Sequence, residues 1–478
     1  MNLLKKFPRT FWIGNTLELF ERWAWYGFFM LFANYLTGSS DMGGLEFSQS
    51  QKGLLMGVGT GILYFLPVLT GAIADRYGYK RVLFLSFLVY ASAFVLLPLF
   101  SSFTGVFLMY LYLAVGAALF KPIIQATVAK TTTAETSSIG FGIFYMIVNI
   151  GSFFGPMVTM LFKSSSSHLV FYISAGIISL NFLLLPFYRE PGRSESRGQE
   201  GESLLSAFGG IFRRMGAILR DTRFMVFLLI VAAFWAMYHQ LFFTLPVFVS
   251  QWVDTSTLYD FFHLRLPFIT AHYSPSPGVM EAEFVTNMDA LYIILFQVLV
   301  SGLIMKLKPL RSMTGGFLVC SIGMALTFVS QNVLFTLLAL LVFGLGEMAG
   351  SPKIQEYIGR IAPPDRKALY MGYSFIPMFI GNLLAGVISG NVYQSMSDKV
   401  SITETFAASR GLQIPEGLST GAYFEEVARQ VNLSPPELTR LLWDSFEPSR
   451  IWMVLLAVGL LAAGCLFVYD RFISKEGR

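Results

Sequence analysis

The sequence predicts an all-α membrane protein with twelve transmembrane helices arranged in two six-helix bundles. Composition is the first indication, since 54% of the 478 residues are hydrophobic, 13% are charged and the mean hydropathy is +0.60. Soluble proteins carry about 25% charged residues. The second indication is the recurrence of apolar runs of about 20 residues, the length that a helix needs to cross a bilayer. Because lipid cannot satisfy backbone polar groups, runs of this length favour helices.

Six helices are expected before a polar stretch of the chain and six after it. They occupy residues 10–36, 50–74, 81–99, 103–129, 138–162, 169–188, 223–252, 287–307, 312–331, 333–359, 367–393 and 450–472. Basic residues gather in the loops at one end, at positions 76, 80, 81, 130, 306, 308, 311, 360, 366 and 367, against 52 and 163 at the other. Cytoplasmic loops carry this excess. We therefore expect a monomer in the lipid bilayer of the plasma (inner) membrane, with both termini in the cytoplasm.

The polar segments divide the chain into regions. We expect an N-terminal bundle at 1–189, a cytoplasmic linker at 190–222 and a C-terminal bundle at 223–478, the layout of two repeats around a central cavity. Within the linker, residues 204–219 form either an amphipathic helix on the membrane face or a tether. Two extracytoplasmic loops are long, 254–287 and 395–449. The second predicts two short helices, AYFEEVARQV and SPPELTRLLW, the latter opening on a capping box of Ser434 and Glu437.

Several classes of protein are excluded. The net charge of +5 comes from loops and termini rather than from a basic stripe interleaved with aromatic residues, so no nucleic-acid binding is expected. Cys320 and Cys465 fall inside predicted helices, which leaves no disulfide framework and no cysteine-rich metal site. Neither HExxH nor a P-loop is present, so we expect no enzyme, metal or ATP-driven pump. For movement of a solute across the membrane, a proton gradient is the expected energy source, and no cofactor is expected.

The most informative motif lies in the first predicted helix. ELFERWAWYG places Glu18, Glu21 and Arg22 deep in the membrane, where each charge costs about 2.5–3.5 kcal/mol. At about 100° per residue, both carboxylates bracket Arg22. Protonation of either one would release Arg22 for an anionic ligand group. The alternative is an ion-pair cluster that only locks helix packing, but charges in series within a membrane usually mark a transport pathway.

A second motif, GAIADRYGYKR, joins the second and third predicted helices. Gly71 would allow close helix approach, Asp75 could pair with Arg76 or with the other bundle, and Arg81 faces the cytoplasmic surface. The pattern resembles the signature of the major facilitator superfamily at this position. That resemblance implies a cytoplasmic latch, so we expect Asp75, Arg76 and Arg81 to act in gating. The corresponding stretch of the second half, GLIMKLKPLRSM, lacks the acidic residue.

The motif of the first helix narrows the resemblance to one branch. ELFERWAWYG resembles the ExxER motif of the proton-dependent oligopeptide transporters (the POT or PTR family), with Trp25 in place of a tyrosine. Three further stretches match this family in the same order. They are LFKPIIQATVAK with Lys121, FYMIVNIGSFFGP with Asn149, and GLGEMAGSP followed by APPDRKALYMG with Glu347. Tyr64 falls where the family has a substrate-contacting tyrosine.

The resemblance implies a proton symporter that imports di- and tripeptides or peptide-like solutes by alternating access. Arg22 and Lys121 would receive the substrate carboxylate. Glu347 and Asn149 would receive its amino group. The residues assigned to the substrate are then Arg22, Tyr26, Tyr64, Lys121, Asn149 and Glu347. Since the two ends of a zwitterion meet opposite bundles, substrate binding would favour closure.

One departure from the family pattern changes the expected coupling. In FWAMYHQ, the acidic residue that usually precedes the glutamine is His239, so Lys121 has lost its usual partner. Either His239 titrates in its place, as its intrinsic pKa permits, or proton coupling rests on Glu18 and Glu21 alone.

Two alternatives follow from these departures and from the long second loop. The same fold could carry another organic anion or an amphiphile, and could export it rather than import it. Less in keeping with the motifs, the protein could be a non-transporting membrane sensor that binds a partner through residues 395–449.

Overall fold

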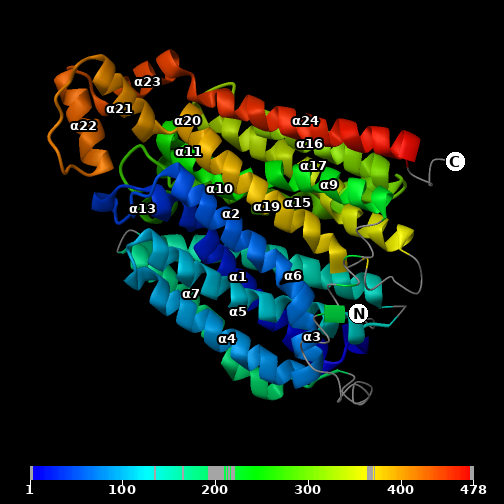
Figure 1. Cartoon of the computed structure of the whole chain (residues 1–478). Coiled ribbons are helices and arrows are strands. Elements are labelled where there is room, and N and C mark those ends of the chain that lie inside the picture. The colour runs from blue at the N-terminus through cyan, green and yellow to red at the C-terminus, as the bar shows by residue number, and fades with distance from the viewer. Residues whose placement is uncertain are drawn as a thin grey trace.

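The chain folds into two bundles of long helices that lie side by side (Figure 1). The computed structural model describes residues 4–133, 136–163, 166–191, 209–210, 213, 216, 221–362, 370 and 372–473. The helices of the N-terminal bundle are α1 (Arg9–Thr37), α2 (Gln49–Phe65), α3 (Pro67–Tyr77), α4 (Tyr79–Leu96), α5 (Phe103–Lys130), α6 (Ser137–Lys163) and α7 (Ser167–Leu184). Those of the C-terminal bundle are α9 (Thr222–Tyr238), α10 (Gln240–Phe243), α11 (Leu245–Trp252), α14 (Ala282–Thr286), α15 (Met288–Ile304), α16 (Pro309–Leu326), α17 (Val333–Ile361), α19 (Ile376–Val387), α20 (Tyr393–Met396) and α24 (Ile451–Val468). The prediction of an all-α membrane protein is confirmed.

Ten segments of the described chain are long and apolar enough to cross a bilayer, when α2 and α3 are counted as one span bent by 42°. The bend lies at Pro67, which lacks the N–H that a continuous helix would use. Two more long helices, α1 and α16, pack among these spans, α1 against α6 and α7 and α16 against α17 and α24. Together they are consistent with the predicted layout of twelve helices.

The seventh predicted helix is broken where one continuous span was expected. Residues 223–252 form α9, α10 and α11, with His239 between the first two and Thr244 between the last two. Thr244 has a φ of −112°, and Pro246 follows in the first turn of α11. Because proline cannot donate a backbone hydrogen bond, it favours a fresh helical start at this point. The break between α10 and α11 therefore lies five residues beyond His239.

Short helices extend the bundles at one end. The segment Lys399–Phe446, which we name the cap, contains α21 (Lys399–Ser409), α22 (Thr420–Gln430) and α23 (Pro435–Phe446). The sequence predicted two of these helices, α22 and α23, and missed α21. The capping box expected at the start of α23 is present, since Oε2 of Glu437 accepts a hydrogen bond of 2.8 Å from the Ser434 amide. The first long loop forms α12 (Ser256–Arg265) and α13 (Pro267–Tyr273), which were not predicted. The predicted amphipathic helix at 204–219 lies almost entirely outside the described residues.

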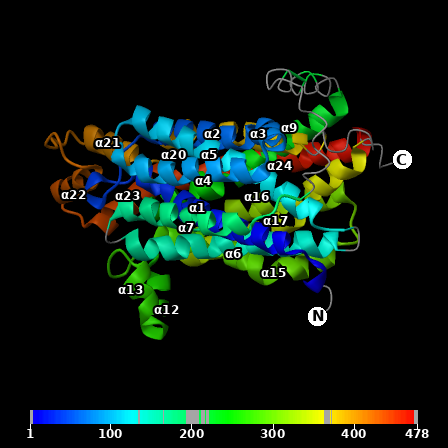
Figure 2. The same cartoon turned by 90° about the horizontal axis from the view of Figure 1, so that it is seen from below.

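The cap lies at the end of the molecule opposite to that where α1 begins and α24 ends (Figures 1 and 2). We name the two ends the cap end and the terminal end. All helices of the two bundles run roughly along the line that joins these ends. Side chains in the middle of α1, α5, α9, α15 and α17 therefore lie between the two ends.

Glycines allow the closest helix contacts. A Cβ on Gly53 of α2 would lie 2.2 Å from the carbonyl oxygen of Gly386 on α19, so these helices join the bundles backbone to backbone. A Cβ on Gly155 of α6 would lie 2.5 Å from the carbonyl oxygen of Trp23 on α1, so these two helices also pack backbone to backbone. The close helix approach predicted for Gly71 is wrong in this conformation, because its nearest neighbour would be Pro122 at an ordinary 3.9 Å.

Candidate functional site

A buried ion-pair cluster occupies the middle of α1. The Nε of Arg22 lies 3.1 Å from Oε1 of Glu18 and 2.5 Å from Oε2 of Glu21, so both carboxylates bracket the guanidinium as the spacing predicts. All three residues are buried, Glu21 completely. The hydroxyl of Tyr90 on α4 donates to the other oxygen of Glu21 at 3.0 Å, a contact that the sequence did not reveal. The helix α1 thus holds a satisfied but protonatable charge cluster.

Cationic and aromatic side chains extend this cluster across the N-terminal bundle. Lys121 on α5, beside Pro122, lies with its Nζ 4.9 Å from the ring centre of Tyr64 on α2. Its charge interacts with the carboxylates of Glu18 and Glu21. The guanidinium of Arg22 lies 5.8 Å from the ring centre of Tyr26, one turn along α1. The structure thus brings Arg22, Lys121, Tyr26 and Tyr64 together, as the sequence predicts.

The C-terminal bundle contributes a carboxylate. Glu347 on α17 is 7% exposed, and its Oε1 accepts a hydrogen bond of 2.8 Å from the hydroxyl of Tyr238 on α9. It interacts electrostatically with Tyr26 and Tyr145 of the opposite bundle, so it faces the interface between the bundles. Asn149, which was predicted to assist it, donates to the carbonyl of Tyr145 in its own helix.

His239 lies in the interface with both ring nitrogens engaged. Its Nδ1 lies 2.8 Å from the carbonyl oxygen of Trp235, and its Nε2 lies 3.3 Å from Nδ2 of Asn382 on α19. A neutral imidazole with its hydrogen on Nδ1 donates to the first and accepts from the second. The ring centre of Tyr64 lies 6.3 Å from that of His239, so the histidine borders the lysine site. Its titration during transport stays a prediction.

Asp289 on α15 is a buried carboxylate that sequence reasoning missed. It is 5% exposed, and its Oδ1 has no hydrogen-bond partner among the described residues. It lies against α17, since a Cβ on Gly344 would be 3.0 Å from that oxygen. An aspartate in the apolar run MDALYIILF was the available signal, two residues inside the predicted helix 287–307.

The predicted gating residues lie at the terminal end. Asp75 is exposed and accepts a hydrogen bond of 3.1 Å from the hydroxyl of Tyr79, which in turn accepts one from Lys130 at 3.0 Å. Arg76 lies over the ring of Tyr77, and Arg81 is exposed. These contacts all stay within the N-terminal bundle. A gating role for Asp75, Arg76 and Arg81 therefore stays a prediction.

Ionic contacts join the bundles at the cap end. Lys163 on α6 lies with its Nζ 2.7 Å from Oε2 of Glu281 and 3.0 Å from Oε2 of Glu283 on α14. Asn34 of α1 donates to Oε1 of Glu283 at 2.9 Å. Lys52, expected in a loop, lies fully buried in the first turn of α2 and donates to the carbonyl of Phe243 at 2.8 Å. We name Lys163, Asn34, Glu281 and Glu283 the outer cluster.

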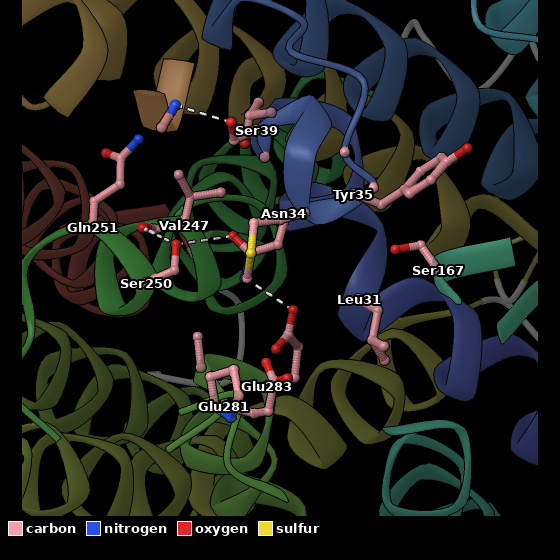
Figure 3. Close-up of a pocket in the computed structure, with 18 of the residues that line it drawn as sticks. Leu31, Asn34, Tyr35, Ser39, Ser167, Val247, Ser250, Gln251, Glu281 and Glu283 are labelled. Atoms are coloured by element: carbon pink, nitrogen blue, oxygen red, sulfur yellow. Dashed lines mark hydrogen bonds between the residues drawn. The ribbon is translucent and has the colours of Figure 1, made fainter. Parts of the chain in front are cut away.

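A cavity of about 420 Å³, lined in part by the outer cluster, lies between the bundles and the cap (Figure 3). Its walls include Leu31 and Tyr35 of α1, Val247 of α11, and Lys399 at the start of the cap. Arg22, Lys121 and Glu347 do not line it. This cavity, which we name the outer cavity, is thus separate from the charged residues at mid-depth.

The cap contacts the N-terminal bundle through Glu46, between α1 and α2. Its Oε1 accepts hydrogen bonds of 2.8 Å from the amides of Ser40 and of Thr420 at the start of α22. Glu46 adopts a left-handed φ of +53°, which is uncommon for glutamate. Partial burial raises the pKa of Glu46, but these hydrogen bonds outweigh it and hold the pKa below its ordinary value. The cap is therefore tied to both bundles.

Two helical bundles with buried charges at mid-depth and contacts at one end define a membrane transporter of the alternating-access class. Residues 12–264 match the family model of the Major Facilitator Superfamily, and the chain belongs to this superfamily. It is a multi-pass membrane transporter and not an enzyme. The family resemblance drawn from the motifs is thereby confirmed at the level of the superfamily.

Relatives and solved structures similar to the chain differ in the cargo that their names give. A Na⁺, Li⁺, K⁺/H⁺ antiporter of Planococcus maritimus is 25% identical over 72% of this chain and 81% of its own. The multidrug resistance protein MdtH of Photorhabdus laumondii is 22% identical over 72% of this chain and 78% of its own. The crystal structure of a POT family transporter in complex with 5-aminolevulinic acid superposes with a TM-score of 0.73, at 16% identity, over 98% and 97% of the two chains. The chain thus has the fold of the POT family transporters.

Proposed function

We propose that the protein is a proton-coupled symporter that imports small zwitterionic peptides or peptide-like solutes. The observation that carries the proposal is the separation of charge across the interface between the bundles. Arg22 and Lys121 lie on the N-terminal side, and Glu347 lies on the C-terminal side. Tyr26 interacts with both Arg22 and Glu347, so it links the two sides. A solute with a carboxylate at one end and an ammonium group at the other matches this arrangement.

Binding and transport follow from the same charges. Protonation of Glu18 or Glu21 would remove one partner of Arg22 and free the guanidinium for the substrate carboxylate. A substrate held by both bundles would favour their closure, because each of its charges is satisfied only when the bundles approach. Loss of the proton at the other side of the membrane would return the carboxylate to Arg22 and expel the substrate.

The proposal includes the orientation and the energy source. We assign the cap end to the outside of the plasma (inner) membrane and the terminal end to the cytoplasm, because the predicted basic loops lie at the terminal end. The described structure then has its outer end held closed by the outer cluster and by the contact of Gly53 with Gly386. A proton gradient drives the cycle, and no cofactor takes part.

Uptake of labelled dialanine into proteoliposomes tests the proposal. An inward proton gradient is expected to drive accumulation, which Arg22→Ala abolishes. Arg22→Lys, the matched control, keeps the charge but loses the paired hydrogen bonds, so uptake falls to an intermediate level. Uptake that ignores both the gradient and Arg22→Ala would reject the proposal.

A second candidate keeps the fold and changes the cargo to an amphiphilic organic ion that is exported. It is favoured by the multidrug resistance relatives and by the neutral hydrogen-bonding pattern of His239. Binding of dialanine, alanine and tetraphenylphosphonium to the purified protein separates the two candidates. A thermal shift with tetraphenylphosphonium and none with dialanine would favour the exporter.

A further inference from the structure

Two buried carboxylates of the C-terminal bundle have no cationic partner. Glu347 is 7% exposed and Asp289 is 5% exposed, and neither forms an ion pair among the described residues. Oε2 of Glu347 and Oδ1 of Asp289 also have no hydrogen-bond partner there. An ionised carboxylate without a partner is costly in a membrane protein, and such groups commonly carry protons.

The carboxylate of Asp289, which belongs to α15, lies against the same face of α17 that carries Glu347. A Cβ on Gly344 would be 3.0 Å from Oδ1 of Asp289, and Gly344 precedes Glu347 by three residues, which places both on the same side of the helix. The two carboxylates also influence each other electrostatically. Two like charges at such a site cannot both ionise without cost, so they hold a proton as a pair.

Among the residues that the structure describes, the surroundings of the pair supply no neutralising charge. The groups that interact with the pair are Tyr26 on α1, Tyr145 on α6, Tyr238 on α9, Tyr292 on α15 and Cys320 on α16. Tyrosine and cysteine are ordinarily neutral near pH 7. On α6 and α14, which pack against α15, Lys163 is paired with Glu281 and Glu283.

The remaining charged side chains of the neighbouring helices point elsewhere. On α12, which packs against α17, Asp260, His263 and Arg265 are exposed. On α16, Arg311 is exposed, and farther along α17 Lys353 is paired with Glu356. A proton is therefore the cation that can neutralise the pair.

We propose that Asp289 and Glu347 form a proton-binding pair that couples transport to the proton gradient, replacing the carboxylate absent at His239. This inference rests on the proposed symport function and assigns its one transported proton to the pair rather than to Glu18 or Glu21. The Tyr238 hydroxyl donates to Glu347 and stabilises its ionised form, so Asp289 is the member that holds the proton.

The proton balance is simple. In the outward-facing state one proton from the external water converts the Asp289 carboxylate to a carboxylic acid. In the inward-facing state the same proton leaves to the cytoplasmic water and restores the carboxylate. No other bond is made or broken, and the pair moves one proton in each cycle.

Two transport assays on the full-length protein in proteoliposomes test the pair. One measures accumulation driven by a pH gradient, and the other measures exchange at equal pH. Under a gradient of one pH unit, a one-proton symporter accumulates labelled dialanine about tenfold, since the proton and substrate gradients balance at equilibrium. Exchange of internal for external dialanine at equal pH requires no net proton movement. Asp289→Asn, which cannot release a proton, is expected to lose the accumulation and to keep the exchange. Asp260→Asn, the same change on the exposed face of α12, is expected to keep both.

Three results would overturn the inference. If Asp289→Asn still accumulates dialanine about tenfold, the pair does not couple transport. If a variant with an unchanged melting temperature loses exchange as well, Asp289 binds substrate instead. Infrared spectra of the purified protein supply a readout without transport. At neutral pH the wild type is expected to show a band from a protonated carboxyl group that Asp289→Asn lacks. If the wild type lacks this band, the inference is also overturned. If wild-type protein shows this band but neither mode of transport, the proposed symport fails while the proton-binding pair stands.

Discussion

The Nζ of Lys163 on α6 lies 3.0 Å from Oε2 of Glu283 on α14, and this ion pair joins the two bundles at the cap end. The Glu283 side chain is completely buried, whereas 26% of the Lys163 side chain is exposed. Removing one partner of such a pair leaves an uncompensated charge, which is costlier than the pair itself. The outer cluster therefore favours the conformation in which the cap end is closed.

Lys163→Met is expected to shift the protein toward an open cap end. The partial exposure of Lys163 reduces the effect to about 1 kcal/mol, or roughly a fivefold change in population. Labelling of Ser250→Cys, at the outer cavity, by a membrane-impermeant maleimide measures the shift, in a background where the exposed Cys465 is replaced by serine. Lys163→Arg keeps the charge and should label at the original rate. Equal rates for Lys163→Met and its parent would contradict this role.

Gly53→Ala is expected to hold the cap end open. The added methyl group would lie 2.2 Å from the carbonyl oxygen of Gly386, so α2 and α19 must move apart. Overpacking of this kind costs about 1–3 kcal/mol in the closed conformation. Distances between spin labels on the two bundles at the cap end should lengthen. Gly71→Ala, where the neighbour is at 3.9 Å, is the matched control and should leave the distances unchanged.

His239→Glu is expected to strengthen proton coupling. A carboxylate at this position would border Tyr64 and the Lys121 site and would give Lys121 the partner that it lacks. Uptake of dialanine should then depend more steeply on the pH gradient. His239→Gln serves as control, since its amide can still accept a hydrogen bond from Asn382 without titrating. A steeper dependence in both variants, or in neither, would speak against a role for charge at this position.

Acid is expected to loosen the cap from the N-terminal bundle. Because the pKa of Glu46 in the folded protein lies below its ordinary value of 4.5, its stabilising contribution is complete above pH 4.5 and is lost as the pH falls through the lowered value. The protection of the Thr420 and Gly421 amides against hydrogen exchange, measured relative to their intrinsic rates at each pH, should fall in acid. Glu46→Gln should show the lower protection already at pH 7, with little further change in acid. The exposed Glu416→Gln is the control, and equal protection in all three proteins would refute the contact.

The features that the sequence predicted correctly are local ones. The bracketing of Arg22 by Glu18 and Glu21 depends on spacing within one helix, so helical periodicity suffices to foresee it. The helical spans follow from hydropathy for the same reason, and the capping box of Ser434 and Glu437 joins residues only three apart. The family resemblance added Lys121, Tyr64 and Glu347, whose positions in the structure agree with a common site.

The features that were missed involve contacts between distant residues. In the sequence, Asp289 lies only near the end of a predicted helix. Its contact with α17 at Gly344 joins two different helices and appears only in the tertiary structure. Lys163 looked like an ordinary loop cation, and its partner Glu283 is 120 residues away. The hydrogen bond of His239 to Asn382 joins residues 143 positions apart.

The sequence by itself determined the membrane location, the helical architecture and the presence of costly charges at mid-depth, because hydropathy and periodicity act along one segment. Only the tertiary structure decided the pairing between different helices. Lys163 pairs with carboxylates, His239 contacts an amide and a carbonyl, and Oδ1 of Asp289 has no hydrogen-bond partner among the described residues. The physical reason is that the energy of a buried charge depends on what neighbouring helices place beside it, and that is settled by packing.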